Sequence, residues 1–130
     1  MERRTQKDFK AWLEGRTKDF AVAVFKVLDA MPKKNSTAVI AYQLGKSASS
    51  IGANYSEANR SESGDDFRHK VSIALKEASE TVYWLEILHA LYPMHEVIHN
   101  LCAEAFELRN LLQSIRTSSI AKARTRAPRT

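Results

Sequence analysis

Apolar residues recur at alternating steps of three and four through most of the chain, and this spacing limits the possible fold more than any other feature. Between Gln6 and Met31 there is no proline and one glycine, and the apolar positions mostly keep these steps. Such spacing lines apolar side chains along one face of an α-helix. The pattern returns three times, after breaks at Pro32, residues 59–64 and Pro93. The sequence therefore predicts helices over about 6–31, 37–58, 65–91 and 94–118.

The lengths of these helices and of their connections predict an all-α fold. Short connections between long helices make consecutive helices antiparallel neighbours, as in up-down-up-down bundles. A chain of 130 residues has the size of one domain, and four glycines and three prolines are few enough for long helices. We therefore expect an antiparallel up-down-up-down four-helix bundle over residues 1–118. Residues 119–130 lack apolar periodicity and are expected to form a basic C-terminal arm.

Two of the predicted helix starts carry capping signals. Ser63 is followed three residues later by Asp66, which resembles a capping box with Asp in place of the usual Glu. Before the second helix, Asn35 or Ser36 can accept a hydrogen bond from a free backbone N–H group. These residues therefore mark where the second and third helices are expected to begin.

Positive charge is concentrated at the two ends of the sequence. Residues 1–35 carry nine Lys/Arg against five Asp/Glu, residues 36–118 carry seven against ten, and residues 119–130 carry four against none. The net charge is +5. Such clusters favour nucleic acid or an acidic protein face as a partner, but they also occur as solubilising charges. The charge pattern alone therefore leaves a polyanion partner open.

The sequence favours a cytoplasmic protein. It contains no apolar run of the length that spans a membrane, and its first residues lead into no segment of signal-peptide type. The single cysteine, Cys102, excludes an internal disulfide and agrees with a reducing compartment. We expect no membrane association.

The stretch HEVIH at residues 95–99 matches the H-E-x-x-H signature of zinc peptidases. Such an enzyme needs two histidines one helical turn apart, a glutamate beside the metal-bound water and a third protein ligand. The metzincin continuation would place Gly at 102 and His at 105, where this chain has Cys102 and Ala105. His95, His99 and Cys102 could together ligate zinc, but histidines beside a core seam are commonly hydrogen-bonded structural residues. We therefore assign no catalytic residue, metal or cofactor.

The second and third predicted helices carry a distinctive set of residues. They are Gln43-Leu44; Ala48, Ser50-Ile51, Asn54, Glu57-Ala58 and Arg60-Ser61; and Phe67 with Ile73-Ala74-Leu75-Lys76-Glu77-Ala78 and Glu80-Thr81-Val82-Tyr83-Trp84-Leu85. In these residues the segment 42–88 resembles a family of small four-helix bundle proteins encoded by intervening sequences in bacterial 23S ribosomal RNA genes. The first and fourth helices match mainly in length and pattern.

This resemblance implies an antiparallel four-helix bundle that assembles into a ring, typically a homopentamer, with no established catalytic activity. It also implies a role with RNA, which for the family is inferred mainly from the location of its genes. A related basic and pentameric architecture occurs in the accessory variability proteins of diversity-generating retroelements. Those proteins resemble scaffolds for a reverse transcriptase and its nucleic acid.

Several residues are candidates for packing between subunits. Trp12 and Trp84 lie beside the apolar seams of their helices, and residues 20–25 are apolar all round, which together is more apolar surface than one bundle interior needs. Both tryptophans are alternatively peripheral core residues. In the second helix, Asn54 and Glu57 either specify register or oligomer state as buried polar groups or form a solvated face, and the resemblance favours the first. The motif candidates for packing that the resemblance implies are Gln43, Ser50, Asn54, Glu57 and Arg60.

Basic residues with no role inside a predicted helix are the candidate nucleic-acid contacts. One group shares a face of the first helix, a second lies at the far end of that helix, and a third lies in the arm. The groups are Arg3, Lys7 and Lys10; Lys33 and Lys34; and Lys122, Arg124, Arg126 and Arg129. A ring would repeat each group and make weak phosphate contacts multivalent. Alternatively these residues are solvated charges and the arm is a disordered tail.

Three functions from different classes agree with these observations. The first is a non-enzymatic oligomeric bundle that binds structured RNA or other nucleic acid through phosphates. Because the sequence indicates no aromatic-rich binding surface, we do not expect stacking on single strands. The second is a protein-interaction scaffold for a nucleic-acid enzyme such as a reverse transcriptase. The third, which we favour least, is a metal-dependent hydrolase.

Overall fold

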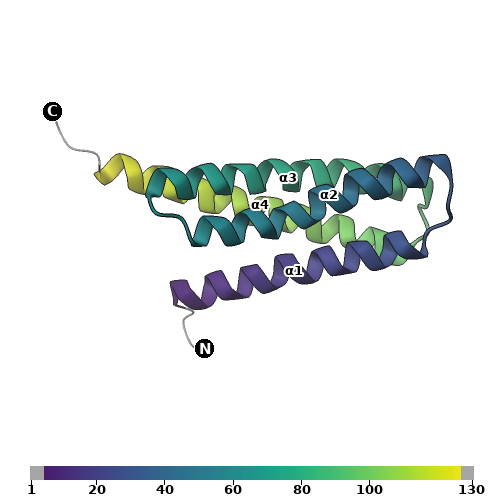
Figure 1. Ribbon diagram of the computed structural model, residues 1–130, viewed down its shortest axis with the longest axis horizontal. Coiled ribbons are helices and arrows are strands. Elements are labelled where there is room, and N and C mark those ends of the chain that lie inside the picture. The colour runs from purple at the N-terminus through teal and green to yellow at the C-terminus, as the bar shows by residue number, and fades with distance from the viewer. Residues whose placement is uncertain (1–4, 127–130) are drawn as a thin grey trace.

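The computed structural model describes residues 5–126, and these residues form four α-helices and no strand. The helices are α1 (Gln6–Ala30), α2 (Asn35–Asn59), α3 (Gly64–Leu91) and α4 (Glu96–Arg126). In Figure 1 each of these helices runs along the long axis of the molecule, and the chain reverses direction at each short connection between them. Within the described range, no helix is long and apolar enough to cross a membrane. The predicted all-α fold with four helices is confirmed.

The connections define two different ends of the bundle. The α2–α3 connection lies at one end with the start of α1 and the end of α4, and we call this the one-loop end (Figure 1). The α1–α2 and α3–α4 connections lie at the other end, the two-loop end. Hydrogen bonds between α3 and α4 agree with these two ends. Arg116, late in α4, donates to Ser72, early in α3, whereas Cys102, early in α4, donates to the carbonyl oxygen of Leu85, late in α3. Residues far apart in the sequence therefore meet at the same end.

Helices α1 and α2 approach each other closely at Gly52. A Cβ atom on Gly52 would lie 2.7 Å from the hydroxyl oxygen of Thr17, so a larger residue would push the helices apart. Thr17 is buried, and its hydroxyl donates a hydrogen bond to the Leu13 carbonyl oxygen at 2.9 Å. We use the contact of Gly52 with Thr17 to divide the bundle into halves. The two-loop half comprises residues 18–51 and 78–110, and the one-loop half comprises residues 5–17, 52–77 and 111–126.

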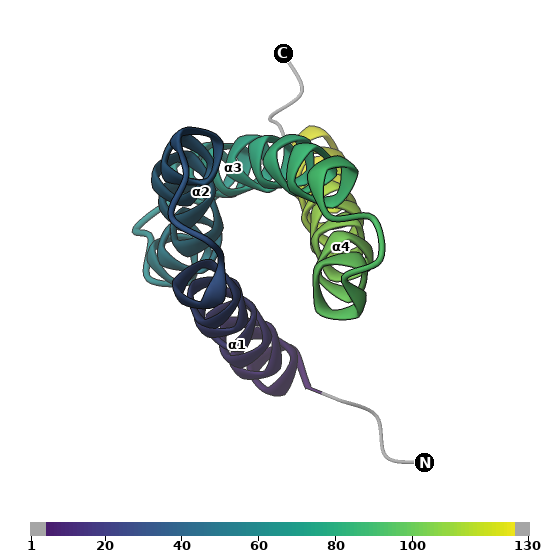
Figure 2. The same ribbon diagram turned by 90° about the vertical axis from the view of Figure 1, so that its right-hand side faces the viewer.

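The four helices surround the core unevenly. Helix α1 packs on α2, α2 on α3 and α3 on α4, and the seam between α1 and α4 is the least extensive of the four. Figure 2 looks along the bundle and shows α1 and α4 apart, with α2 and α3 joining them around the other side. Arg16 of α1 bridges this seam. Its guanidinium donates hydrogen bonds to both carboxylate oxygens of Glu104, at 2.7 and 2.6 Å, and another to Glu107.

Apolar side chains from all four helices fill the interior. The predicted seams are buried almost throughout, and Leu13, Ile51, Leu85 and Leu108 are each 0% exposed. Burying one such side chain stabilises the folded state by about 1.5–3 kcal/mol relative to leaving it in water. Phe67, which the spacing places in the α3 seam, is only half-buried. The core is therefore less complete at the start of α3 than the sequence predicts.

The two predicted capping signals have different outcomes. Ser63 is the N-cap of α3, and its side chain accepts a hydrogen bond from the backbone N–H of Asp66 at 3.0 Å, as expected. The prediction for α2 is wrong, because α2 begins at Asn35 and the N-cap is Lys34. The Thr37 hydroxyl accepts from the Lys34 backbone N–H at 2.9 Å. The N–H of the N-cap residue is thus satisfied by a buried threonine of the first turn, and neither Asn35 nor Ser36 is the N-cap.

Helix α4 is longer than the sequence predicts. It includes residues 119–126, which the apolar spacing assigns to a separate arm. This segment is rich in alanine, lysine and arginine, which are strong helix formers, and it contains no glycine or proline. Basic side chains near the end of a helix also interact favourably with the negative end of its dipole. Residues 119–126 therefore lack an apolar stripe because α4 extends beyond the helices it packs against, although the segment is still helical. Residues 127–130 of the expected arm lie outside the described residues.

Candidate functional site

The structure brings two of the three predicted basic groups to the same end of the bundle. The start of α1 and the end of α4 both lie at the one-loop end, whereas the α1–α2 connection lies at the two-loop end (Figure 1). Predicted contacts at the one-loop end are Lys7, Lys10, Lys122, Arg124 and Arg126, and those at the two-loop end are Lys33 and Lys34. Arg3 and Arg129 lie outside the described residues.

The cations at the end of α4 are open to solvent. Lys122, Arg124 and Arg126 are exposed, and none of them forms an ion pair with another residue of the range 5–126. Figure 1 shows the last turns of α4, in yellow, extending beyond the ends of the other helices. Residues 122 and 126 are about one turn apart and share a face of the helix. A ligand with several negative charges can therefore reach these side chains without displacing a carboxylate.

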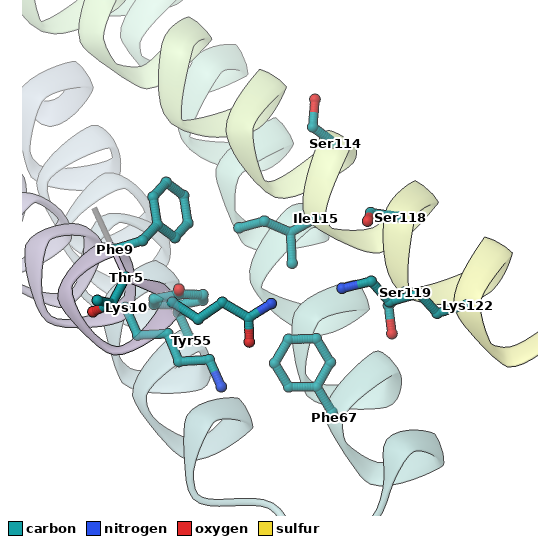
Figure 3. A pocket seen from close by; sticks show the side chains of 11 residues that line it. Thr5, Phe9, Lys10, Tyr55, Phe67, Ser114, Ile115, Ser118, Ser119 and Lys122 are labelled. Atoms are coloured by element: carbon teal, nitrogen blue, oxygen red, sulfur yellow. The ribbon is translucent and has the colours of Figure 1, made fainter. Parts of the chain in front are cut away.

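A pocket of about 590 Å³ lies at the one-loop end, between the start of α1 and the end of α4. All four helices contribute to its lining. Its walls are apolar and largely aromatic, serine hydroxyls line the α4 side, and lysines reach it from α1 and α4 (Figure 3). The lining includes Phe9, Lys10, Tyr55, Phe67, Ser114, Ile115, Ser118, Ser119 and Lys122.

Three aromatic side chains have defined positions around this pocket. Tyr55 is 1% exposed, and burial raises the pKa of its hydroxyl. Phe9 packs against Trp12 with ring centroids 5.6 Å apart. The Lys10 ammonium lies 5.8 Å from the centroid of the Phe67 ring, within reach of a cation–π interaction. The pocket thus combines aromatic faces with positive charge.

A hydrogen-bonded carboxylate joins α1 to α2 in the same half. Glu14 accepts hydrogen bonds from Ser56 at 2.9 Å, from Asn59 at 3.1 Å and from Arg60 at 3.1 Å. Burial by itself would raise the pKa of Glu14, but these hydrogen bonds and the charge of Arg60 outweigh burial and lower it. Arg60, a predicted motif residue, therefore joins the end of α2 to α1 within one chain.

The other predicted motif residues also make contacts within the chain. Asn54 donates a hydrogen bond to the Ser50 carbonyl oxygen one turn earlier, at 2.9 Å. Glu57 accepts a hydrogen bond from the Lys70 ammonium at 2.9 Å, which joins α2 to α3. Gln43, Ser50 and Asn54 are half-buried in this chain. Their role in assembly stays a prediction.

The two tryptophans pack against the side of the core. Both Trp12 and Trp84 are half-buried. The Arg16 guanidinium lies 5.2 Å from the Trp12 ring centroid. Trp84 meets Tyr83 edge to face, with centroids 5.3 Å apart, and Tyr83 is exposed. Within one chain both residues therefore occupy the position of peripheral core residues, and part of each surface remains uncovered.

The HEVIH stretch lies at the start of α4. Nδ1 of His95 accepts a hydrogen bond from the backbone N–H of Ile98 at 3.2 Å and so caps the helix. The Cys102 thiol donates to a carbonyl oxygen of α3, and burial raises the pKa of this thiol. His99 lies beside His89, with ring centroids 5.5 Å apart. Across residues 5–126, no three His, Cys, Asp or Glu side chains gather as a metal site requires.

The pocket and its aromatic lining are not indicated by the pattern of any one helix. Phe9, Tyr55 and Phe67 belong to three helices, and each has a spacing that is ordinary for a helix seam. A usable signal did exist, because the start of α1, the end of α2 and the start of α3 fall at one end of an up-down-up-down bundle. Collecting the aromatic and basic residues near those three positions and near the end of α4 would have indicated the site.

The fold and the site define a small all-α bundle that has a pocket and exposed positive charge at its one-loop end. A family model for 23S rRNA-intervening sequence proteins matches residues 3–114, and the chain belongs to this family. A crystal structure of a protein of unknown function from the S23 ribosomal protein family of Bacteroides thetaiotaomicron has a TM-score of 0.74 and 32% sequence identity to this chain, covering 83% of this chain and 97% of that one. No curated protein matches. The family predicted from residues 42–88 is confirmed.

Proposed function

We propose that this protein binds structured RNA, or another nucleic acid, through phosphate contacts made by the one-loop end. One observation carries the proposal: Lys10 of α1 and Lys122 of α4 line the same pocket, and Arg124 and Arg126 continue the positive charge along exposed turns of α4. The names of the family and of its S23 relative refer to 23S rRNA and to ribosomal protein, which supports RNA as the polyanion.

Contacts of this kind follow from charge rather than from base identity. Lysine and arginine bind phosphates with release of condensed counterions, so affinity falls steeply as salt rises. Contacts to phosphate position a protein on a nucleic acid but carry no direct sequence information. We therefore expect the one-loop end to recognise the shape and charge of an RNA helix, with little discrimination between paired sequences.

We further infer that subunits assemble as a homopentameric ring of antiparallel up-down-up-down bundles. The reversed order of contacts between α3 and α4 supports the antiparallel arrangement. Exposed apolar side chains such as Phe25, at 44%, and Tyr42, at 67%, support burial against another subunit. A ring would repeat the basic end around its axis and would make individually weak phosphate contacts multivalent.

We further propose that the protein is a cytoplasmic binding protein, that it is not an enzyme and that it uses no cofactor. Three side chains of reactive types are engaged in structural contacts. His95 caps α4, and Glu14 accepts hydrogen bonds from Ser56 and Asn59 of α2 and from Arg60, which follows α2. The Cys102 thiol has a raised pKa because it is half-buried, so it is a poor nucleophile at neutral pH.

Binding to a folded fragment of 23S ribosomal RNA across a salt series tests the proposal. One triple variant removes the charges at the end of α4, and a control removes three exposed lysines elsewhere. The variants are K122Q/R124Q/R126Q and K18Q/K26Q/K76Q. The slope of log affinity against log salt should become shallower by about two to three units in the first variant, because each phosphate contact contributes roughly 0.7–0.9.

The control variant separates local contacts from total charge, since both variants lose the same three charges. It should keep nearly the slope of the natural protein. Equal slopes for the two variants would place the phosphate contacts elsewhere on the surface. Absence of binding by the natural protein near physiological salt would contradict the RNA-binding proposal itself.

A second candidate function is a protein-interaction scaffold for a nucleic-acid enzyme such as a reverse transcriptase. The exposed side chains of Val39, at 56%, and Tyr42, at 67%, favour it, because they offer an apolar surface on α2 that one chain leaves uncovered. This candidate gains support if RNA affinity is absent while a purified reverse transcriptase binds the natural protein and does not bind Tyr42→Asp.

A further inference from the structure

We propose that the pocket at the one-loop end holds a single unstacked nucleotide, with its base against the rings of Phe9 and Phe67 and its phosphate at Lys10 and Lys122. Where this nucleotide belongs to an RNA chain, the inference rests on the proposed function and adds a second mode of contact to it. A free mononucleotide offers the same chemistry, and the test below separates the two sources.

The size and walls of the pocket suit a heteroaromatic ring. Its volume of about 590 Å³ lies within the range of roughly 300–1,000 Å³ that small-molecule sites occupy. Phe9 and Phe67 are half-buried and line the pocket, so part of each ring remains open to a ligand (Figure 3). Every base has a π-face, and stacking on phenylalanine is tolerant of base identity. The contact of Phe9 with Trp12 restricts the Phe9 ring before a ligand arrives.

The polar groups of the pocket match the other parts of a nucleotide. Ser118 and Ser119 line the α4 side, and a hydroxyl both donates and accepts hydrogen bonds, so it fits the edges of different bases. Lys10 and Lys122 reach the pocket from opposite sides (Figure 3). Neither forms an ion pair with another residue that the structure describes. Both ammonium groups are therefore available to a phosphate.

The ring proposed to stack the base and the cation proposed to bind the phosphate are close enough for one nucleotide to contact both. The Lys10 ammonium lies 5.8 Å from the centroid of the Phe67 ring. A base that stacks on this face of Phe67 takes the place of the Lys10 ammonium, and the displaced cation is then near the phosphate of that base or the next one along a strand. Burial of the base also strengthens the ionic contact, because it excludes water from the space between the two groups.

The same features favour a nucleotide over an aliphatic anion. An aliphatic chain leaves the serine hydroxyls on the α4 side of this pocket without partners, whereas the edge of a base can form hydrogen bonds with them. Arg124 and Arg126 continue the positive charge beyond Lys122, so a strand that leaves the pocket meets further cations. Structured RNA presents unstacked bases of this kind in bulges and loops, where proteins commonly stack them on aromatic side chains.

An RNA duplex with one bulged 2-aminopurine, compared with the same duplex lacking the bulge, tests this inference. The natural protein should bind the bulged duplex about tenfold more tightly, since stacking a base on an aromatic side chain is commonly worth such a factor or more. The emission of 2-aminopurine should change on binding, because the base moves from the duplex onto the phenylalanine rings.

Two serine-to-phenylalanine variants assign the effect to the pocket. Ser118 is exposed and lines the pocket, so Ser118→Phe fills the space without a change in the core. Ser79→Phe places the same ring on an exposed position of α3 in the two-loop half. Ser118→Phe should lose the tenfold preference and keep its affinity for the plain duplex within about twofold, whereas Ser79→Phe should keep both.

The outcomes distinguish this inference from the proposed function. Equal affinity of the natural protein for the two duplexes, or a preference that persists in Ser118→Phe, overturns the pocket inference while RNA binding stands. If neither duplex binds, the proposed function fails, and a titration with AMP observed by NMR decides the inference alone. AMP binding that is lost only in Ser118→Phe supports a site for free nucleotides, and no AMP binding overturns it.

Discussion

The two halves of the bundle present different surfaces. All nine exposed large hydrophobic side chains within the described residues lie in the two-loop half. That half carries six Lys/Arg against seven Asp/Glu, whereas the described one-loop half carries eleven against seven. The nine exposed side chains are Val22, Phe25, Val39, Tyr42, Tyr83, Leu91, Met94, Val97 and Phe106.

One small bundle can therefore separate two kinds of contact. Exposed apolar side chains that gather in one region are typical of protein–protein contacts. An excess of exposed cations is typical of contact with a polyanion. Because the two features lie in opposite halves, assembly through the two-loop half would leave the cations at the one-loop end open. The proposals of a ring and of RNA binding therefore do not compete for one surface.

The largest expected effect tests whether the halves also differ in packing. Ile98 and Ile115 both lie on α4, but Ile98 is 0% exposed in the two-loop half, whereas Ile115 is half-buried beside the pocket. Ile98→Ala should lower the free energy of unfolding by about 3 kcal/mol, because it leaves a cavity in a closed core. Ile115→Ala should cost about 1 kcal/mol, because its surroundings are already open.

Urea unfolding of both variants at one protein concentration measures this difference, since association would add to the stability of each. Equal losses would mean that the one-loop end is as tightly packed as the two-loop half. In that case the space beside Ile115 would not be available to a ligand.

The four helices could be predicted because their signals are local. Apolar spacing within a segment and breaks at Pro32 and Pro93 depend only on residues close in sequence. The end of α4 could not be predicted in this way, since residues 119–126 favour helix by composition but have no apolar stripe. The start of α2 is a related case. Asn35 is a good capping residue by type, but it lies inside α2, and the buried Thr37 accepts a hydrogen bond from the N–H of the N-cap residue Lys34.

The candidate site could be predicted only in part. The cations near both ends of the sequence are visible as charge, so Lys10 and Lys122 were found separately. Their approach to one pocket depends on the packing of α1, α3 and α4, which no local pattern encodes. The expectation that the chain has no aromatic binding surface likewise overlooked Phe9 and Phe67, which are distant in sequence and come together only in the fold.

A second prediction tests the role of the two-loop half in assembly. Val39→Asp with Tyr42→Asp places two charges on exposed positions of α2. If these side chains pack against another subunit, burying the charges should weaken association about 100-fold or more. The control T117D/A121D introduces the same charges at exposed positions of the one-loop half and should not change association.

Sedimentation equilibrium of the natural protein and both variants measures this effect. Dissociation of V39D/Y42D together with an intact T117D/A121D assembly would assign the subunit contact to the two-loop half. Dissociation of both, or of the control alone, would move the subunit contact to the one-loop end and would contradict a separation of the two surfaces.

The smallest expected effect concerns pH and the one-loop half. The pKa of Glu14 is lowered in the folded protein, because hydrogen bonds from Asn59, Ser56 and Arg60 outweigh the effect of burial. A carboxylate of this kind stabilises the fold at pH values above its unfolded pKa, and the contribution is lost as the pH falls through the folded pKa. Lowering the pH from 7 to 4 and below should therefore destabilise the natural protein by up to about 1 kcal/mol more than Glu14→Gln.

Urea unfolding at several pH values separates Glu14 from the other carboxylates. Glu86→Gln replaces an exposed carboxylate inside α3 in the two-loop half, away from the helix ends where the dipole acts, and should follow the natural protein. If Glu14→Gln also follows it, the hydrogen bonds to Ser56, Asn59 and Arg60 do not depend on the charge of Glu14. The seam between α1 and α2 would then be no more sensitive to acid than the two-loop half, and the contrast between the halves would be confined to their surfaces.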